Sequence, residues 1–162
     1  MNESNEYVST MQPRTPGAAF LLAQVGAHAA ARFAERLARL QLQPQHAGAL
    51  RILSAKEGLT QRELADRLGM FPSRAVALVD DLEQRGLVQR HEDPEDRRSY
   101  ALRLTEKGRR TLAEVGRVAR EHQEALCKAL EPRERDQLAD LLLRIAEDQG
   151  LTPGVHPGYR RL

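Results

Sequence analysis

The stretch Asp93-Pro94-Glu95-Asp96-Arg97-Arg98 determines how the fold of this chain is interpreted, because it joins a turn to an arginine pair and a neighbouring carboxylate. Pro94 fixes its own φ and Asp93 favours a turn, so the chain is expected to reverse direction here. Short apolar runs flank the stretch with the spacing of two half-buried strands, at Leu87-Val88 and at Tyr100, Leu102 and Leu104. The sequence therefore predicts a β-hairpin with a charged tip.

The two arginines at this tip need neutralising charge. Arg97 and Arg98 repel each other, and Asp96 can meet only part of that need. A nucleic-acid backbone, or a narrow minor groove, attracts arginine and would meet the rest. A solvated charged hairpin is the alternative interpretation, and the residues upstream bear on the choice.

Two short helices joined by a tight turn are predicted upstream of the hairpin. Thr60 and Glu63 have the spacing of a capping box, and Gly69 is placed to end the first helix in the left-handed conformation. Pro72 suits the first position of a second helix that ends at Gly86. This helix is expected to turn its apolar residues inward, namely Ala75, Val76, Leu78, Val79 and Leu82. Helix, turn, helix and hairpin together predict a winged helix-turn-helix.

In that arrangement the second helix is free to enter a major groove, with its first turns facing base edges. Arg74 offers a bidentate fork that matches guanine, Ser73 can donate to a phosphate or a base, and Ala77 lies one turn further on. Gln61 and Arg62 start the preceding helix and would position the protein on the DNA backbone. For each of these residues an ordinary solvated helix surface is the alternative.

The run from Leu59 to Arg110 resembles the MarR (multiple antibiotic resistance regulator) family of bacterial transcription factors. The resemblance rests on the hairpin stretch, on Leu82-Glu83-Gln84-Arg85-Gly86-Leu87-Val88, and on Leu104-Thr105-Glu106-Lys107-Gly108. The spacing and helix order extend from about Gly17 to about Gly150. One departure is Phe71, which stands where such helices often have a capping Asp or Ser, and which leaves part of that task to Ser73.

The resemblance implies a homodimer that binds a palindromic operator through a region of terminal dimerisation helices. It also implies repression that is relieved by a small anionic or phenolic ligand or by cysteine oxidation. By resemblance, Asp96 would brace the wing arginines, and Arg97 and Arg98 would contact the minor groove or its phosphates. The helix that starts at Pro72 would read the major groove.

The rest of the chain fits one mainly α domain with a small β-hairpin wing, an α+β organisation. Residues 1–16 are expected to be a mobile arm, and residues 151–162 a tail. Within the domain at 17–150, residues 44–104 form the winged helix-turn-helix, and 17–43 and 105–150 form the dimerisation helices. Helices are predicted over about 18–40, 44–58 and 105–130, and from Pro132 onward.

The last predicted helix is more apolar than one buried face requires. Its three consecutive leucines cover well over half of the helix circumference, since successive residues are rotated by about 100°. A partner subunit would cover the remaining face, and a strictly intramolecular packing is the alternative. The apolar residues of this helix are Leu138, Leu141, Leu142, Leu143 and Ile145, and those of the first helix are Phe20, Leu21, Leu22 and Val25. A two-fold dimer would read inverted half-sites about one helical turn apart.

Overall charge gives little support for DNA binding, because the net charge is only +2. The helix-turn-helix itself carries acidic residues, among them Asp66, Asp80, Asp81 and Glu83. From Arg97 to Arg110, however, six basic residues accompany the single acidic residue Glu106. This local cluster is the expected electrostatic footprint of a wing and the helix after it.

The thiol and imidazole groups indicate no redox or metal chemistry. Cys127 is the only cysteine, so the chain is predicted to be cytoplasmic, and the thiol is read as packed or half-exposed. The five histidines show no spacing that places two ligands on one helix face. No cofactor or metal is therefore expected. The resemblance disfavours peroxide sensing, because redox-sensing members of the family tend to have their reactive cysteine near the first helix, where this chain has none.

A small-molecule pocket is the more plausible regulatory site. In the family it commonly lies between the dimerisation helices and the helix-turn-helix. The groups that could bind an aromatic carboxylate there are His28, Arg32, Phe33, His46 and Arg51. A constitutive DNA-binding regulator without a ligand is the alternative.

Two other classes of function were weighed. The chain shows no recognisable nucleophile with a base, carboxylate pair or metal site, so it is not expected to be an enzyme. A winged helix can also bind another protein in place of DNA, which makes a protein-interaction module the alternative function. No membrane role is expected, because the apolar run around Ala18–Ala23 is far too short to span a bilayer.

Overall fold

The computed structural model describes residues 16–92, 100–156 and 159. The predicted arm (residues 1–16) therefore lies outside the described residues except for its last position, and so do Asp96, Arg97 and Arg98 of the predicted wing tip. The helices are α1 (Ala18–Ala38), α2 (Pro44–Ala55), α3 (Gln61–Leu68), α4 (Pro72–Gln84), α5 (Glu106–Leu126) and α6 (Pro132–Asp148). The strands are β1 (Leu59–Thr60), β2 (Val88–Glu92) and β3 (Tyr100–Leu104). The mainly α fold with a small β component is confirmed.

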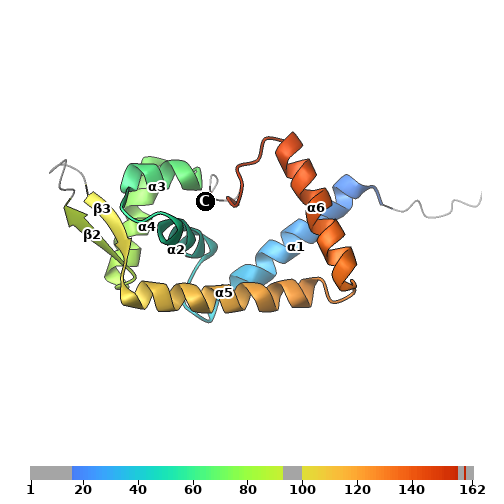
Figure 1. The fold of residues 1–162 in the computed structure, drawn as a ribbon, viewed down its shortest axis with the longest axis horizontal. Helices are drawn as coiled ribbons and strands as arrows, with labels where there is room; N and C mark the ends of the chain where they lie inside the picture. The colour runs from blue at the N-terminus through green and yellow to red at the C-terminus, as the bar shows by residue number, and fades with distance from the viewer. Residues whose placement is uncertain (1–15, 93–99, 157–158, 160–162) are drawn as a thin grey trace, which may run out of the picture.

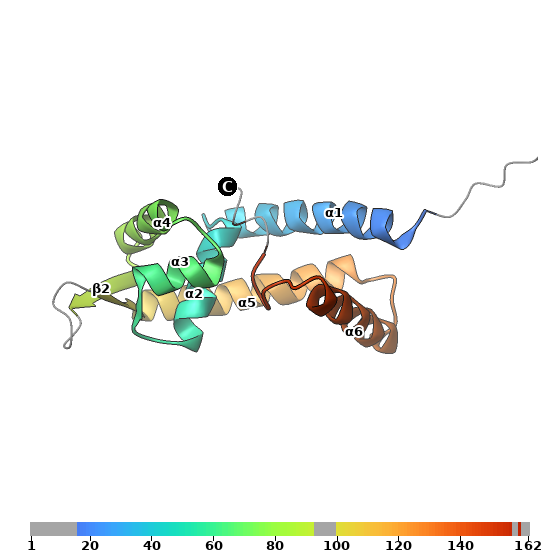
Figure 2. The same cartoon turned by 90° about the horizontal axis from the view of Figure 1, so that it is seen from above.

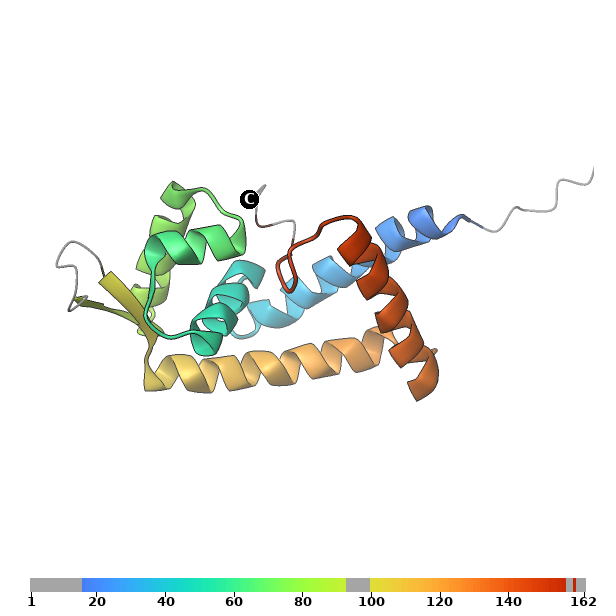
Figure 3. The same cartoon turned by 45° about the horizontal axis from the view of Figure 1, so that its top comes forward.

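The helices are arranged around the long α5. Helices α2, α3 and α4 and the strands gather at the N-terminal end of α5, while α6 lies at its other end (Figure 1). Helix α1 packs against α5, and in the view from above the two helices lie along the same direction of the molecule (Figure 2). The last described residues leave α6 and return toward α2 (Figure 3).

The strands form one antiparallel sheet in the order β1-β3-β2. The sequence did not predict β1, which is only two residues long and pairs Leu59 with Leu102. The expected alternation in β3 is also wrong at its start, since Tyr100 is 49% exposed and Ala101 is buried. Ala101 is buried because it pairs with Thr60 of β1 on one side and with His91 of β2 on the other. Tyr100 is exposed because it lies past the end of β1.

Helix α3 begins and ends at the residues predicted from its capping signals. The Glu63 amide donates to the Thr60 hydroxyl at 3.2 Å, and the Thr60 amide donates to the Glu63 carboxylate at 2.8 Å. The bonds from Thr60 hold the pKa of the Glu63 carboxyl below its ordinary value. Gly69 ends the helix at φ 65°, a left-handed conformation that costs glycine least. Both ends of α3 are therefore fixed by local sequence.

Helix α4 begins at Pro72 as expected, with Phe71 at the cap position. No side chain in the described part of the chain caps it, so the cap predicted for Ser73 is absent there. Its buried residues are Ala75, Leu78, Val79 and Leu82. The prediction that Val76 points inward is wrong, because Val76 is 41% exposed and lies beside Arg74 and Ala77 on the solvent side.

One core unites the helix-turn-helix, the sheet and the start of α5. Its fully buried members include Leu50 and Leu53 of α2, Leu64 and Leu68 of α3, and Leu102 of β3. Burial of each such leucine contributes about 1.5–3 kcal/mol, so this core holds α4 by its inner face and leaves the outer face free.

The first turn of α5 packs very close to Leu87, in the turn between α4 and β2. Thr105 caps α5 as predicted, accepting from the Gly108 amide at 2.9 Å. A Cβ on Gly108 would lie 2.1 Å from the carbonyl oxygen of Leu87, closer than two atoms can approach. Gly108 is therefore required for the contact between α5 and the wing.

Several helices are shorter than predicted. Helix α1 ends at Ala38 instead of Leu40, α2 ends at Ala55 before Gly58, and α5 ends at Leu126 with Cys127 at its C-cap. None of the residues of α6 is buried. In contrast, the segment after α6 packs back on the core, because Tyr159 is buried and Val155 is partly buried against the same cluster.

Candidate nucleic-acid interface and ligand cavity

The outer face of α4 carries the residues predicted to read DNA. Ser73, Arg74 and Ala77 are all exposed there. Phe71 and Val76, which are 68% and 41% exposed, add two apolar side chains to the same face. Sequence analysis assigned neither of them to this surface, and only their place at the start of the helix could have suggested it. The face therefore offers one guanidinium, one hydroxyl and apolar contacts.

The two residues predicted to contact the DNA backbone from α3 differ in their surroundings. Arg62 is exposed at the first turn of α3. Gln61 is half-buried, and its Oε1 accepts a hydrogen bond from Arg90 Nη2 at 3.1 Å. Gln61 thus already has a protein partner, whereas Arg62 keeps its guanidinium in solvent.

Arg90 anchors the base of the wing to the helix-turn-helix, a role that sequence analysis missed. Its side chain on β2 is 23% exposed and forms ion pairs with Asp80 and Glu83 of α4. Burial alone would lower the pKa of Arg90, but the hydrogen bonds and charges of the two carboxylates outweigh it and raise that pKa. The acidic residues of α4 therefore hold the hairpin and do not form an unpaired negative patch.

The basic stretch that follows the wing is partly used within the protein. Arg109 pairs with Glu57 at 2.7 Å, and Arg110 pairs with Glu106 at 3.3 Å. Lys107 Nζ donates to the carbonyl of Arg85 at 2.7 Å. The charge count over residues 97–110 did not include Glu57, because this partner of Arg109 is distant in sequence. Arg103 remains exposed on β3.

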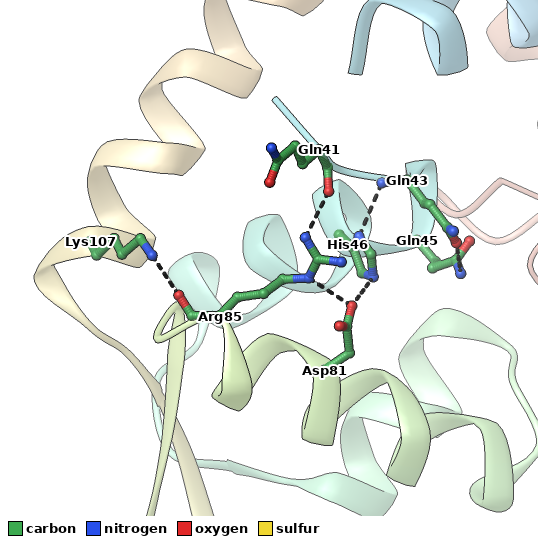
Figure 4. Close-up of polar contacts among 7 residues, drawn as sticks. All are labelled: Gln41, Gln43, Gln45, His46, Asp81, Arg85 and Lys107. Atoms are coloured by element: carbon green, nitrogen blue, oxygen red, sulfur yellow. Dashed lines mark hydrogen bonds and ion pairs between the residues drawn. The ribbon is translucent and has the colours of Figure 1, made fainter. Parts of the chain in front are cut away.

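A polar cluster joins α4 to the start of α2 (Figure 4). His46 is 4% exposed, and its Nε2 lies 2.9 Å from Asp81 Oδ2. Burial lowers the pKa of His46, and the nearby Arg85 charge acts in the same direction, while Asp81 opposes both. Beside this cluster lies a cleft of about 330 Å³ that Arg74 and Ala77 help to line. His46 therefore faces α4 and lines this cleft.

The larger cavity, of about 630 Å³, lies between α1, α2, α5 and the C-terminal segment. Its walls are mostly apolar, with Phe33 from α1, Ala47 from α2 and Val115 from α5. Arg51 lines it and donates to the carbonyl of Gly154. Of the five predicted ligand-binding residues, the structure brings only Phe33 and Arg51 together at this cavity.

The C-terminal segment closes one side of the cavity. Tyr159 is buried against Gly48, and its hydroxyl donates to the carbonyl of Pro44 at 3.0 Å. Burial raises the pKa of the Tyr159 phenol, although the charge of Arg51 acts against this shift. Sequence analysis treated residues 151–162 only as a tail, and a lone tyrosine in a Gly- and Pro-rich segment was the one available signal.

His28 and Arg32 lie in a different, smaller pocket of about 170 Å³ with Arg36 and His122. The His122 ring packs against Phe33 at a tilt of 41°, with ring centroids 5.4 Å apart. Burial lowers the pKa of His122, and the charges of Arg36 and His28 add to that shift. Among the described residues, no group of three or more His, Cys, Asp or Glu is arranged to hold a metal ion.

Comparison with known proteins gives a consistent match. Residues 40–99 match the sequence model of the MarR family. The chain is similar to the transcriptional repressor MprA of Escherichia coli, with 37% identity over 83 residues, which are 51% of this chain and 47% of that protein. The chain spans about half to two thirds of the length of the curated relatives it matches.

Two solved structures resemble nearly the whole of the described fold. The transcriptional repressor CouR, bound to a 23-mer DNA duplex, is 37% identical with a TM-score of 0.72, covering 80% of this chain and 92% of that one. A MarR-family transcriptional regulator from Rhodococcus sp. RHA1 is 32% identical with a TM-score of 0.68, covering 79% and 91%. MprA, CouR and this regulator all carry names of transcriptional regulators, in agreement with the prediction that the chain is not an enzyme. No helix in the described ranges is long and apolar enough to cross a membrane.

Proposed function

This chain belongs to the MarR family, and on that premise we propose that it is a dimeric, sequence-specific DNA-binding transcriptional regulator. The observation that carries the proposal is the free outer face of α4, where Ser73, Arg74 and Ala77 are exposed while the opposite face is buried. The similarity to CouR, whose structure contains a DNA duplex, supports the same conclusion.

In this proposal α4 reads the major groove. Arg74 recognises guanine through two parallel hydrogen bonds, and Ser73 contacts a phosphate or a base. Ala77 and Val76 contact thymine methyl groups, because apolar side chains recognise thymine in this way. Arg62 binds the backbone near the start of α3 and sets the register of the protein. Gln61 assists by holding the wing through Arg90.

The wing forms a second contact. We infer that Arg97 and Arg98 bind the minor groove or its phosphates and that Asp96 braces them, as the family resemblance implies. The paired Arg90 supports this inference, because it fixes the root of β2 to α4 and so fixes where the hairpin leaves the domain. Exposed Arg103 extends the basic surface next to the wing.

Two chains are proposed to pair through α1 and α6. Helix α6 has no buried residue, and its Leu143 and Ile145 are 55% and 47% exposed. On α1, Phe20 and Val25 are 60% and 51% exposed. Large apolar side chains exposed along both helices are characteristic of an interface, and a symmetric dimer covers them with the same elements of a second copy.

The cavity between α1, α2 and α5 is the proposed effector site. Its size and apolar walls suit an aromatic ring held against Phe33, with Arg51 available to a carboxylate or phenolate. A ligand there separates the DNA-binding elements from the dimerisation helices and moves the two α4 helices out of successive grooves. We therefore propose repression that a small anionic or phenolic ligand relieves.

In vitro selection from a library of random duplexes tests the DNA-binding proposal directly. We expect enrichment of an inverted repeat whose half-sites lie about one helical turn apart, with affinity that falls steeply as salt rises. Failure to enrich any duplex would favour the alternative of a protein-interaction module. Calorimetric titration of aromatic acids and phenols into the protein tests the ligand. If none binds and none releases DNA, a constitutive regulator replaces the ligand-controlled one.

A further inference from the structure

Asp81 makes the central contacts between α4 and the corner between α1 and α2, which comprises residues 39–43 and the first turn of α2 (Figure 4). Its Oδ2 lies 2.9 Å from both His46 Nε2 and Arg85 Nε. Arg85 Nη1 also donates to the main-chain carbonyl of Gln41 at 2.8 Å. The C-terminal half of α4 is therefore attached to the corner at two separate points.

The tautomer of His46 is fixed by its other partner. His46 Nδ1 accepts a hydrogen bond from the Gln43 amide at 3.0 Å, as part of the capping box that starts α2. A neutral imidazole whose Nδ1 is an acceptor carries its proton on Nε2, where it donates to Asp81. One ring thus connects the cap of α2 to a carboxylate on α4.

The corner itself has an unusual conformation. Gln41 has φ 57°, and it is the single residue other than glycine with positive φ in the described part of the chain. Such a conformation is unfavourable for a non-glycine residue and persists where its surroundings hold it. The hydrogen bond from Arg85 to the Gln41 carbonyl supplies such a constraint.

We propose that Gln41, His46, Asp81 and Arg85 form an orientation lock that sets the distance between the two α4 helices of the dimer. The inference rests on the proposed function, because it requires two chains that place α4 in successive grooves. Half-sites of helix-turn-helix dimers lie about 34–36 Å apart, so a rotation of α4 about this joint changes which spacing fits. The lock determines half-site spacing, while Arg74 determines base identity.

The lock also adjoins the proposed effector cavity. Pro44 and Ala47 line that cavity, and His46, on the same turn of α2, faces α4. A ligand that shifts this turn therefore shifts the imidazole that holds Asp81. The orientation lock is the contact through which occupancy of the cavity reaches α4.

Double electron–electron resonance, which measures the distance between two spin labels, tests the lock on the full chain. A nitroxide at Val76→Cys, an exposed position on α4, reports the distance between the two copies when Cys127→Ser removes the native thiol. We expect one narrow distance distribution in this background and a clearly broader one after Asp81→Asn. The matched control is Asp80→Asn, which makes the same change on the neighbouring residue, whose carboxylate pairs with Arg90 instead.

The outcomes separate the lock from the proposed function. Absence of any dipolar coupling in the background protein would mean that no dimer forms and would overturn the proposed function. Coupling that stays equally narrow in Asp81→Asn and in Arg85→Gln would overturn the lock alone. Arg85→Gln breaks the same joint from the other side, so it decides the matter if Asp81→Asn does not fold.

DNA binding gives a second readout that a merely structural role would not change. The duplex is the inverted repeat selected by the wild type, with and without one additional central base pair. We expect the insertion to weaken wild-type binding by about tenfold and Asp81→Asn binding by less than about threefold. A uniform loss of affinity for both duplexes, with the tenfold ratio kept, would contradict the lock.

Discussion

The hydroxyl of Tyr159 donates to the carbonyl of Pro44 across 115 positions of sequence, at 3.0 Å, and so joins the C-terminal segment to the first turn of α2. This contact closes one side of the apolar cavity. It also links the C-terminal segment to the turn of α2 that carries His46. The first turn of α2 therefore contacts the C-terminal segment, the cavity and α4.

Replacing Tyr159 by Phe should remove only this hydrogen bond. The free energy of unfolding is expected to fall by about 0.5–1.5 kcal/mol, because the Pro44 carbonyl loses its partner. Urea denaturation followed by circular dichroism measures it. Tyr159→Ala also removes the buried ring and should cost about 3–5 kcal/mol. Equal stability of Tyr159→Ala and the wild type would show that the tail does not cover the cavity in solution.

Gly108→Ala should destabilise the fold by about 1–3 kcal/mol, although alanine is the better helix former. The added methyl group would collide with the Leu87 carbonyl, 2.1 Å away, and push α5 from the wing. Thermal unfolding measures the change. Gly116→Ala on the same helix is the control, since its methyl group would meet only the Arg120 guanidinium at 3.6 Å. The control should be neutral or more stable, and two equal effects would rule out the close contact.

Stability should decline below about pH 6.5, the ordinary pKa of histidine. The folded-state pKa of His46 is lowered by burial, with Arg85 acting in the same direction and Asp81 opposing, so the unfolded chain binds more protons in this range. The contribution is fully present above pH 6.5 and is lost as pH falls toward the folded pKa. Unfolding measured from pH 7.5 to 5.5 should show it.

The pH test has a direct control. The pKa of His122 is also lowered, so this residue adds to the decline of the unfolding free energy with falling pH. His46→Gln is therefore compared with His122→Gln. In each variant the free energy of unfolding should fall less between pH 7.5 and pH 5.5 than it does in the wild type. A wild-type slope that His46→Gln leaves intact would show that His46 does not carry the effect.

Dimerisation should fail when the apolar face of α6 is charged. Leu142→Asp is expected to give monomers at micromolar concentration in sedimentation velocity, because a carboxylate buried at an interface loses its hydration without a partner. Arg144→Glu, also on α6, is the control for added negative charge at an exposed polar site. Wild-type protein that sediments as a monomer would contradict the proposed interface.

Sequence reasoning succeeded where structure is set by neighbours in the chain. The capping box of Thr60 and Glu63, the left-handed Gly69 and the Pro72 start of α4 depend on residues within one turn of each other. These signals are sufficient to predict a helix-turn-helix.

The features that were missed depend on residues far apart in sequence. Strand β1 exists because Leu59 pairs with Leu102, and two residues carry no periodicity of their own. Arg90 is indistinguishable from a surface arginine until Asp80 and Glu83 are folded beside it. Val76 continues an apolar run, and only the packing of α4 shows that this position faces solvent.

The wing and α4 should affect DNA binding differently. Arg98→Ala should weaken binding to most duplexes about equally and reduce the salt dependence, because phosphate contacts carry little sequence information. Fluorescence anisotropy with selected and scrambled duplexes at several salt concentrations measures both effects. Loss of affinity for the selected duplex alone would assign Arg98 to base recognition instead.

The most direct test of the central claim is the affinity of wild-type and Arg74→Ala protein for the selected inverted repeat and for each of its single-base variants. A dimeric reader of DNA predicts that the wild type loses about 1–3 kcal/mol at each base of a half-site. Arg74→Ala should lose that discrimination at one or two positions and keep it elsewhere. Equal wild-type affinity for the repeat and for a scrambled duplex, or an unchanged profile in Arg74→Ala, would contradict the account.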